Sequence, residues 1–166
     1  MIASRSRAAS QGFTLIEIMV VVVVIGIILA VARVNLMPDE RQMVEDEAAR
    51  LALLLELAHD TAATRSLSLA WSVSPQGYVF SQQNEKGDWV EQSAIETLRA
   101  RTLPAEMRVM SLSIQHQAVP LTEKLLFTSS GVGTAFEIVL VLKQQRRRIV
   151  GNLAGRVWVE KDVGSM

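Results

Sequence analysis

The sequence predicts an α+β protein in which a long N-terminal helix, with a membrane half and an amphipathic half, packs on an antiparallel β-sheet domain. Three patterns predict it: an apolar run, a helical stripe of small and apolar residues, and a later change to the alternating period of strands. They divide the chain into four parts: a basic leader at 1–12, a transmembrane helix at 13–32, an amphipathic helix at 33–66 and a β-rich domain at 67–166.

The apolar run at 13–32 contains a single ionisable side chain, Glu17. At about 1.5 Å per helical residue the run is long enough to cross a hydrocarbon core of about 30 Å. Many of its residues are Val and Ile, but in lipid the backbone must satisfy its own hydrogen bonds, which favours a helix. A secretory signal peptide cut after Ala32 is the alternative, and it leaves Gly12 and Glu17 unexplained.

The flanking charges predict how the chain is oriented. Arg5 and Arg7 precede the apolar run, so the positive-inside rule places the N-terminus in the cytoplasm, although Arg33 weakens the asymmetry. The chain has no cysteine and a formal net charge of zero, and without residues 1–12 it has 15 basic and 17 acidic residues. This balance gives no general affinity for polyanions.

Glu17 needs a physical reason, because a carboxylate inside a membrane costs about 2.5–3.5 kcal/mol on insertion scales. One interpretation is that its side chain reaches back to the membrane interface. The other is that a cation meets it in an assembled state. If the leader is removed after Gly12, the new α-amino group of Phe13 on a neighbouring subunit is such a cation.

Residues 12–17 read Gly-Phe-Thr-Leu-Ile-Glu. This motif resembles the class III signal of type IV pilins and of type II secretion pseudopilins. The resemblance implies that a prepilin peptidase cuts after Gly12 on the cytoplasmic side and methylates the new N-terminal Phe13. It also implies that Glu17 pairs with the N-terminal amine of a neighbour during filament assembly.

A second helix is predicted from the stripe that follows Pro38, a residue that should end or kink the first helix near Met37. A coiled coil is the alternative, but the short, alanine-rich period favours close packing on a sheet. The stripe recurs at spacings of three and four and consists of Val44, Ala48, Leu51, Leu55, Ala58 and Ala62. Charged residues mostly lie elsewhere on the helix: Glu45, Glu47, Arg50, Glu56 and Asp60.

After residue 66 the period changes, which predicts roughly six or seven short antiparallel strands. Turn residues at 75–77, 84–87 and 151–152 separate several of them. Leu67, Leu69 and Trp71 should share one face of the first strand, and Met110, Leu112 and Ile114 one face of a later strand. The expected strand segments are 66–73, 78–80, 88–90, 108–116, 136–142 and 156–160.

The β-rich part resembles minor pseudopilin H of type II secretion, chiefly over residues 127–140, where Ser-Ser-Gly-Val at 129–132 departs from the Pro, Asp or Glu common in that family. The resemblance implies a structural subunit near the tip of a periplasmic pseudopilus that helps export folded proteins across the outer membrane. Implied partners are minor pseudopilins I, J and K, major pseudopilin G, the prepilin peptidase and the inner-membrane assembly platform. The chain would be a single-pass inner-membrane protein with a periplasmic C-terminal domain.

No chemistry is expected from the remaining motifs. The chain lacks G-x-S-x-G and the phosphate-binding G-x-x-x-x-G-K-[ST], so we expect no enzyme and no cofactor. Its two histidines, His59 and His116, are too few for a zinc site without cysteine and are expected on the surface. We therefore predict no metal. A signal-anchored periplasmic enzyme is the least favoured interpretation.

Arg146, Arg147 and Arg148 form the only basic run. The plainer interpretation is a solvated hairpin connection between strands ending near Lys143 and starting near Ile149. The functional one is contact with a partner or with DNA, since three arginines at one tip could bind phosphates. Related minor type IV pilins act in pilus assembly or DNA uptake, which is the alternative function. Under the secretion interpretation no nucleic acid is expected.

Overall fold

The computed structural model describes residues 14–35 and 39–160, with side chains for 14–29 and 39–160. The chain forms two compact units, Met1–Pro38 and Asp39–Met166, which are described separately. The predicted cleavage between Gly12 and Phe13 and the predicted effect of Pro38 fall outside the described residues.

The first unit contains helix α1, Leu15–Asn35. Thr14 caps its N-terminus, because the backbone N–H of Glu17 donates to the Thr14 hydroxyl (3.3 Å) and to the Thr14 carbonyl (3.1 Å). All the large apolar side chains described on α1 are exposed in the isolated chain. Among the described residues, no helix combines the length and apolarity that crossing a membrane requires.

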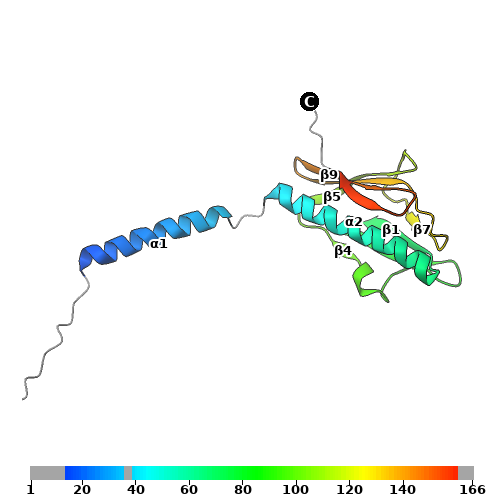
Figure 1. Cartoon of the computed structure of the whole chain (residues 1–166), viewed down its shortest axis with the longest axis horizontal. Coiled ribbons are helices and arrows are strands. Elements are labelled where there is room, and N and C mark those ends of the chain that lie inside the picture. Colours follow the sequence, from blue (N-terminus) through cyan, green and yellow to red (C-terminus); the bar gives the residue numbers. More distant parts are fainter. Residues whose placement is uncertain (1–13, 36–38, 161–166) are drawn as a thin grey trace, which may run out of the picture. The chain divides into compact units, whose positions relative to one another are not determined.

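The second unit begins with helix α2, Glu40–Arg65, which lies along the strands (Figure 1). The Asp39 carboxylate caps its start by accepting from the Arg41 N–H (3.1 Å). At its end Ser66 adopts the left-handed conformation, and the Leu67 N–H bonds the Ala62 carbonyl. The predicted stripe is confirmed, because all six of its residues are fully buried. The helix contacts strands of both sheets, as expected for packing on a sheet.

The described residues form ten strands in two antiparallel five-stranded sheets, where the sequence predicts fewer. Sheet A has the order β3-β2-β1-β7, with β4 also paired to β2. Its strands are β1 (Leu69–Ser74), β2 (Gly77–Gln83), β3 (Trp89–Glu91), β4 (Arg101–Thr102) and β7 (Leu125–Phe127). The 3-10 helix η1, Glu96–Leu98, precedes β4.

Sheet B has the order β10-β9-β8-β5-β6. Its strands are β5 (Met107–Ile114), β6 (Gln117–Val119), β8 (Phe136–Leu142), β9 (Gln145–Gly151) and β10 (Val157–Glu160). Strands β4, β6 and β7, which the sequence did not predict, have only two or three residues each. Such short pieces show no period in a sequence.

Two predicted hairpins are confirmed. Ser74 pairs with Gly77 around a two-residue turn between β1 and β2. The 84–88 turn joins β2 to β3, and its Asn84 side chain accepts from the Lys86 and Asp88 N–H groups. Leu69 and Trp71 are buried on one face of β1, as predicted, and the Trp71 ring lies near Tyr78 in the core at a tilt of 40°, with 6.2 Å between ring centroids.

The predicted face of β5 is wrong for Met110. A bulge between Val109 and Ser111 inserts an extra residue opposite β8, so the alternation changes phase at that point. Met110 is 43% exposed, whereas Val109 and Leu112 are both buried. A bulge of this kind leaves Met110 outside the core although its sequence spacing to Leu112 suggests otherwise.

The sequence predicts that buried and exposed residues alternate along the 136–142 strand, but strand β8 does not show this alternation. It is central in sheet B, and Val139 and Val141 on its outer face are buried like Ile138 and Leu140. Cross-strand pairing places Arg108 and Arg146 on either side of Val141. Neighbours across an antiparallel sheet share a face, so the apolar stems of these arginines can cover the valine.

Candidate functional site

The start of α1 carries the candidate assembly residue. Of the predicted processing residues, Gly12 and Phe13 lie outside the described residues. Glu17 lies in the first turn of α1, three residues after the capping Thr14, and is exposed. A carboxylate in the first turn is favoured by the helix dipole and by the uncapped N–H groups there. The helix start therefore holds Glu17 at a defined place without using its charge in a contact among the described residues.

The rest of α1 presents an exposed apolar surface, and its described side chains are not buried against any other part of the chain. Each side chain described at residues 14–29 is exposed, and nearly all are large and apolar. A soluble monomer rarely exposes a continuous apolar surface of this kind, which marks a contact with a membrane or with other proteins. The chemistry available at this surface is hydrophobic packing plus one carboxylate.

The arginine run does not form the predicted hairpin connection, and this is a correction. The turn between β8 and β9 consists of Lys143 and Gln144, so the three arginines lie within β9. Successive side chains of a strand point to opposite faces. Arg147 is therefore buried, while Arg146 and Arg148 are exposed on the other face.

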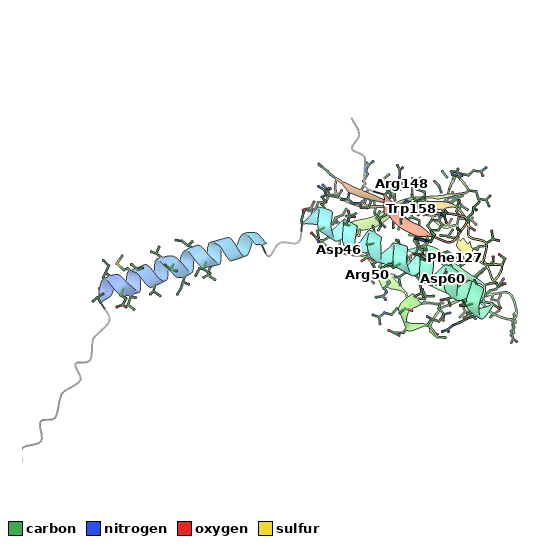
Figure 2. All side chains as sticks on the ribbon, in the orientation of Figure 1. Asp46, Arg50, Asp60, Phe127, Arg148 and Trp158 are labelled. Atoms are coloured by element: carbon green, nitrogen blue, oxygen red, sulfur yellow. The ribbon has the colours of Figure 1, made fainter. Side chains whose placement is uncertain are left out.

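Two of the arginines have acidic partners in the domain. The buried Arg147 guanidinium pairs with Glu45 of α2 and also donates to the Arg146 carbonyl (2.7 Å). Arg148 pairs with Glu137 at 3.2 Å and with Glu160 at 3.3 Å. Figure 2 shows Arg148 among the strands, while Asp46 and Arg50 lie along α2. The run is thus split between a helix-to-sheet contact and a cross-strand ion pair.

Sequence reasoning missed a buried polar contact between α2 and sheet A. Glu47 is only 5% exposed and accepts hydrogen bonds from the Tyr78 hydroxyl (3.1 Å) and from Arg50 (3.0 Å). Burial, followed by the charge and hydrogen bond of Glu47, raises the pKa of Tyr78 above its ordinary range. The sequence spacing could have predicted that Glu47 is buried, because Glu47 lies three residues after Val44 and four before Leu51, on the buried stripe itself.

Sequence reasoning also missed an ion pair at the exposed end of the β8–β9 hairpin. Lys143 Nζ lies 2.5 Å from Glu40 and 3.8 Å from Glu106. Its hydrogen bond with Glu40, with the charges of Glu40 and Glu106, raises the pKa of Lys143. Together with Glu45 and Arg147, this pair ties the first turns of α2 to sheet B.

The prediction that His59 lies on the surface is wrong. It is 7% exposed and packs against Gly155, where a Cβ would come within 2.1 Å of the imidazole. Gly155 also has a positive φ of 78°, so the turn and the close approach both require glycine there. His116 is exposed. No group of three metal-binding side chains gathers within residues 14–35 and 39–160.

Two family models match the chain. The prokaryotic N-terminal methylation motif matches residues 7–32, which include the predicted cleavage site, Phe13 and Glu17. The model of type II transport protein GspH matches residues 47–155, more than half of the 166 residues. No curated protein matches the chain.

Solved structures of the minor pseudopilin EpsH from the type II secretion system of Vibrio cholerae share the fold. One aligns with a TM-score of 0.61 and 14% identity over 75% of this chain and 99% of EpsH. Another gives 0.64 and 14% identity over 77% and 100%. The predicted α+β, pilin-like fold is confirmed by this likeness and by the packing of α2 on antiparallel sheets. With the GspH model covering most of the folded domain, the chain belongs to the type II transport protein GspH family.

Proposed function

We propose that the chain is a minor pseudopilin of a type II secretion system, a structural subunit near the tip of the periplasmic pseudopilus that helps export folded proteins across the outer membrane. The observation that carries the proposal is the joining of an apolar helix, whose described side chains are all exposed, to a GspH-type domain. A filament subunit needs both parts, one to pack with its neighbours and one to define its position.

The proposal includes processing and membrane location. A prepilin peptidase cuts after Gly12 and methylates Phe13, and the methylation motif at residues 7–32 supports this step. Before assembly, residues 13–32 cross the inner membrane once, with the N-terminus in the cytoplasm and the domain in the periplasm. Arg5 and Arg7 support this orientation.

Glu17 acts during assembly in this proposal. Its carboxylate lies in the first turn of α1 with no acid or base beside it within the described part of that helix. In an apolar environment such a charge is stabilised by a cation, and the methylated amine of Phe13 on a neighbouring subunit supplies one. The subunit would therefore be captured by the filament only after its leader is removed.

The proposed partners are minor pseudopilins I, J and K, major pseudopilin G and the inner-membrane assembly platform. EpsH is itself a minor pseudopilin of the type II secretion system. The role is structural, without catalysis. A role as a minor type IV pilin in DNA uptake is not proposed, since Arg147 and Arg148 are engaged with Glu45, Glu137 and Glu160.

The test introduces Glu17→Ala into the full chain in cells that assemble the secretion system. We expect normal leader removal and membrane insertion but loss of disulfide crosslinks to the neighbouring subunit at engineered cysteine pairs. Asp46→Ala, which removes an exposed acid from the domain, is the matched control and should crosslink normally. Normal crosslinking of the Glu17→Ala variant would refute the pairing.

A separate variant tests the processing step. Replacing Gly12 by Val should leave the precursor uncut, which a shift in mobility and an intact N-terminal sequence would report. If the Gly12→Val chain is still cut before Phe13, the proposed peptidase step is wrong.

A further inference from the structure

Two arginines of sheet B differ from their neighbours in having no acidic partner within residues 39–160. Arg147 and Arg148 are both engaged in ion pairs, as described above. Arg108 of β5 and Arg146 of β9 are exposed, and no carboxylate of the described domain lies within ion-pair distance of either guanidinium. We call these two residues the arginine pair.

The strand register brings the arginine pair to one place. Val141 of the central strand β8 lies opposite Arg108 on one side and opposite Arg146 on the other. Paired residues share a face, and two strand spacings place the arginine Cα atoms about 10 Å apart. Val141 is on the outer face but only 3% exposed, which indicates that the arginine stems lie over it. Both guanidinium groups are then within reach of one anionic group.

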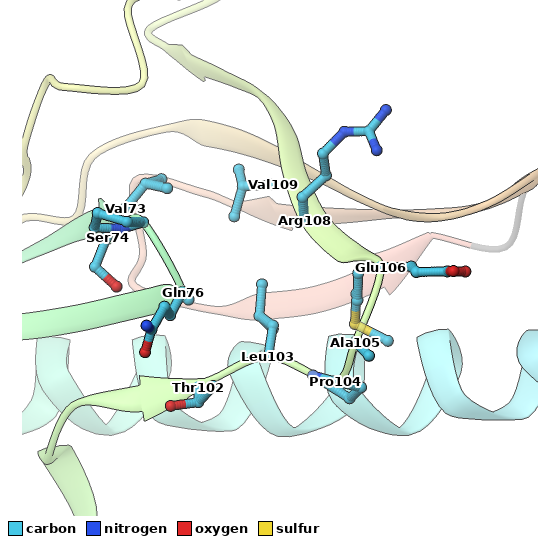
Figure 3. A pocket seen from close by; sticks show the side chains of 13 residues that line it. Val73, Ser74, Gln76, Thr102, Leu103, Pro104, Ala105, Glu106, Arg108 and Val109 are labelled. Carbon is cyan, nitrogen blue, oxygen red and sulfur yellow. The ribbon is translucent and has the colours of Figure 1, made fainter.

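The arginine pair faces the outside of the domain. In Figure 3 the Arg108 side chain points away from the pocket between the two sheets, which Val109 lines. Beside it Met110 is 43% exposed because of the β5 bulge. Exposed cations next to an exposed apolar side chain suit a lipid surface, where the apolar groups enter the interface and the charges stay at the level of the phosphates.

The arginine pair lies at the end of sheet B that contacts the start of α2. Arg146 follows the β8–β9 turn, and Lys143 in that turn pairs with Glu40, the first residue of α2. Only residues 36–39 join Glu40 to Asn35, the last residue of α1. Fully extended, this connection spans at most about 18 Å. The covalent chain therefore keeps this end of the domain close to the C-terminal end of the apolar helix.

We propose that Arg108 and Arg146 bind the phosphates of anionic phospholipids at the periplasmic surface of the inner membrane before the subunit enters a filament. This inference rests on the proposed function, in which residues 13–32 cross that membrane. Guanidinium groups make charge-assisted, bidentate hydrogen bonds with phosphate oxygens. The contact holds the α2-start end of sheet B against the membrane while the subunit waits for assembly.

The covalent link to α1 makes two arginines sufficient. Each basic side chain near an anionic membrane surface strengthens binding by only about fivefold. A domain free in solution would gain little from two of them. Here α1 already confines the domain beside the surface, so the lipid is present at a high effective concentration.

The test uses the isotope-labelled full chain with α1 inserted in lipid nanodiscs that carry a trace of lipid with a gadolinium chelate on its head group. Paramagnetic broadening of each amide signal reports how closely that residue approaches the head groups. The Val141 amide should broaden more in nanodiscs rich in phosphatidylglycerol than in phosphatidylcholine alone. Gly87, in the β2–β3 turn, should not show this difference. Molar salt should remove it, because exposed charges are screened.

Matched variants assign the effect to the arginine pair. Arg108→Gln and Arg146→Gln should each lower the ratio of membrane-bound to free domain by about fivefold, and together by about 25-fold. Arg156→Gln is the control, because it removes the same charge from an exposed arginine that lies outside the pair and has an acidic partner in α2, Glu56. It should leave the ratio unchanged.

Three results would overturn the inference. The first is equal broadening of Val141 in the two lipids, and the second is a phosphatidylglycerol effect that survives loss of both arginines. In either case the inserted α1 leaves the proposed membrane location intact, and only the contact with phosphates is wrong. The third is a chain that does not enter the nanodiscs, which would contradict the proposed membrane location as well.

Discussion

Helices α1 and α2 are similar in length, 21 and 26 residues, but differ in what surrounds them. α1 is apolar almost throughout and exposes its described side chains, whereas the more polar α2 buries eleven residues against the sheets. The difference teaches that the distribution of apolar residues around each helix, and not its total hydropathy, decides what the helix packs against. A one-sided stripe suits a sheet, and an apolar surface all around suits lipid or neighbouring subunits.

The largest expected difference comes from shortening one apolar residue in each helix. Leu55→Ala in α2 removes a fully buried side chain and should lower the free energy of unfolding by about 2–5 kcal/mol. Ile25→Ala in α1, at a residue 50% exposed, should change it by less than about 0.5 kcal/mol. Urea unfolding of the full chain in detergent, followed by tryptophan fluorescence, measures both. Equal effects would remove the distinction between the helices.

The next effect concerns the polar contact that only α2 makes. Tyr78→Phe leaves the buried Glu47 without one donor and should cost about 1–3 kcal/mol. Because the folded-state pKa of Tyr78 is raised above the ordinary 10.0, its contribution is fully present below pH 10 and is lost as pH rises through the folded value. Urea unfolding should therefore show a fall in stability above pH 10 that Tyr78→Phe lacks.

The same prediction has a direct spectroscopic check. Tyr78 is the only tyrosine, so alkaline absorbance reports its ionisation alone. The native protein should resist ionisation at pH 10, and Glu47→Gln should make ionisation easier. A native phenol that titrates at its ordinary value would contradict the buried contact.

A smaller effect is expected where α2 meets β9. Glu45→Ala leaves the buried Arg147 guanidinium without its acid, and the cost should be about 1.5 kcal/mol because Glu45 itself is partly exposed. Glu91→Ala, which removes an exposed acid from β3, is the matched control. Thermal unfolding compares the two. If Arg147→Met in the Glu45→Ala background fails to recover stability, the unpaired charge is not the cause.

The smallest effect belongs to the exposed pair at the start of α2. Lys143→Ala should lower stability slightly at low salt, and the difference should vanish in molar salt, since exposed pairs are screened. The raised pKa of Lys143 means that its contribution is present below pH 10.5 and lost above it. Melting temperatures at two salt concentrations test this, and a salt-independent loss would point to packing instead.

Much of the fold was predictable because strong local patterns produced it. The α2 stripe, the two-residue turn before Gly77 and the Asn84 turn each depend on residues close in sequence. The division into two sheets was not predictable, because it rests on strands of two or three residues and on pairings between distant segments. The β5 bulge at Met110 likewise depends on the partner strand and not on the spacing of apolar residues.

The candidate site was predictable only in part. The position of Glu17 after Thr14 follows from a capping pattern in adjacent residues. The acidic partners of Arg147 and Arg148 lie on other elements that are distant in the sequence. The run of three arginines therefore gave no sign that its members make two separate contacts. Glu47 and His59 were predicted to face solvent because they are polar, although both lie on the buried side of α2.

The Asp39 cap has a consequence for the order in which the two helices form. Starting a helix is the unfavourable step, and a capped start lets α2 nucleate without propagation from residues that precede it. The domain thereby contains the start signal of its own first helix, and its core can form without waiting for α1 to become helical. Folding of the domain and helix formation in α1 can then take place as independent events.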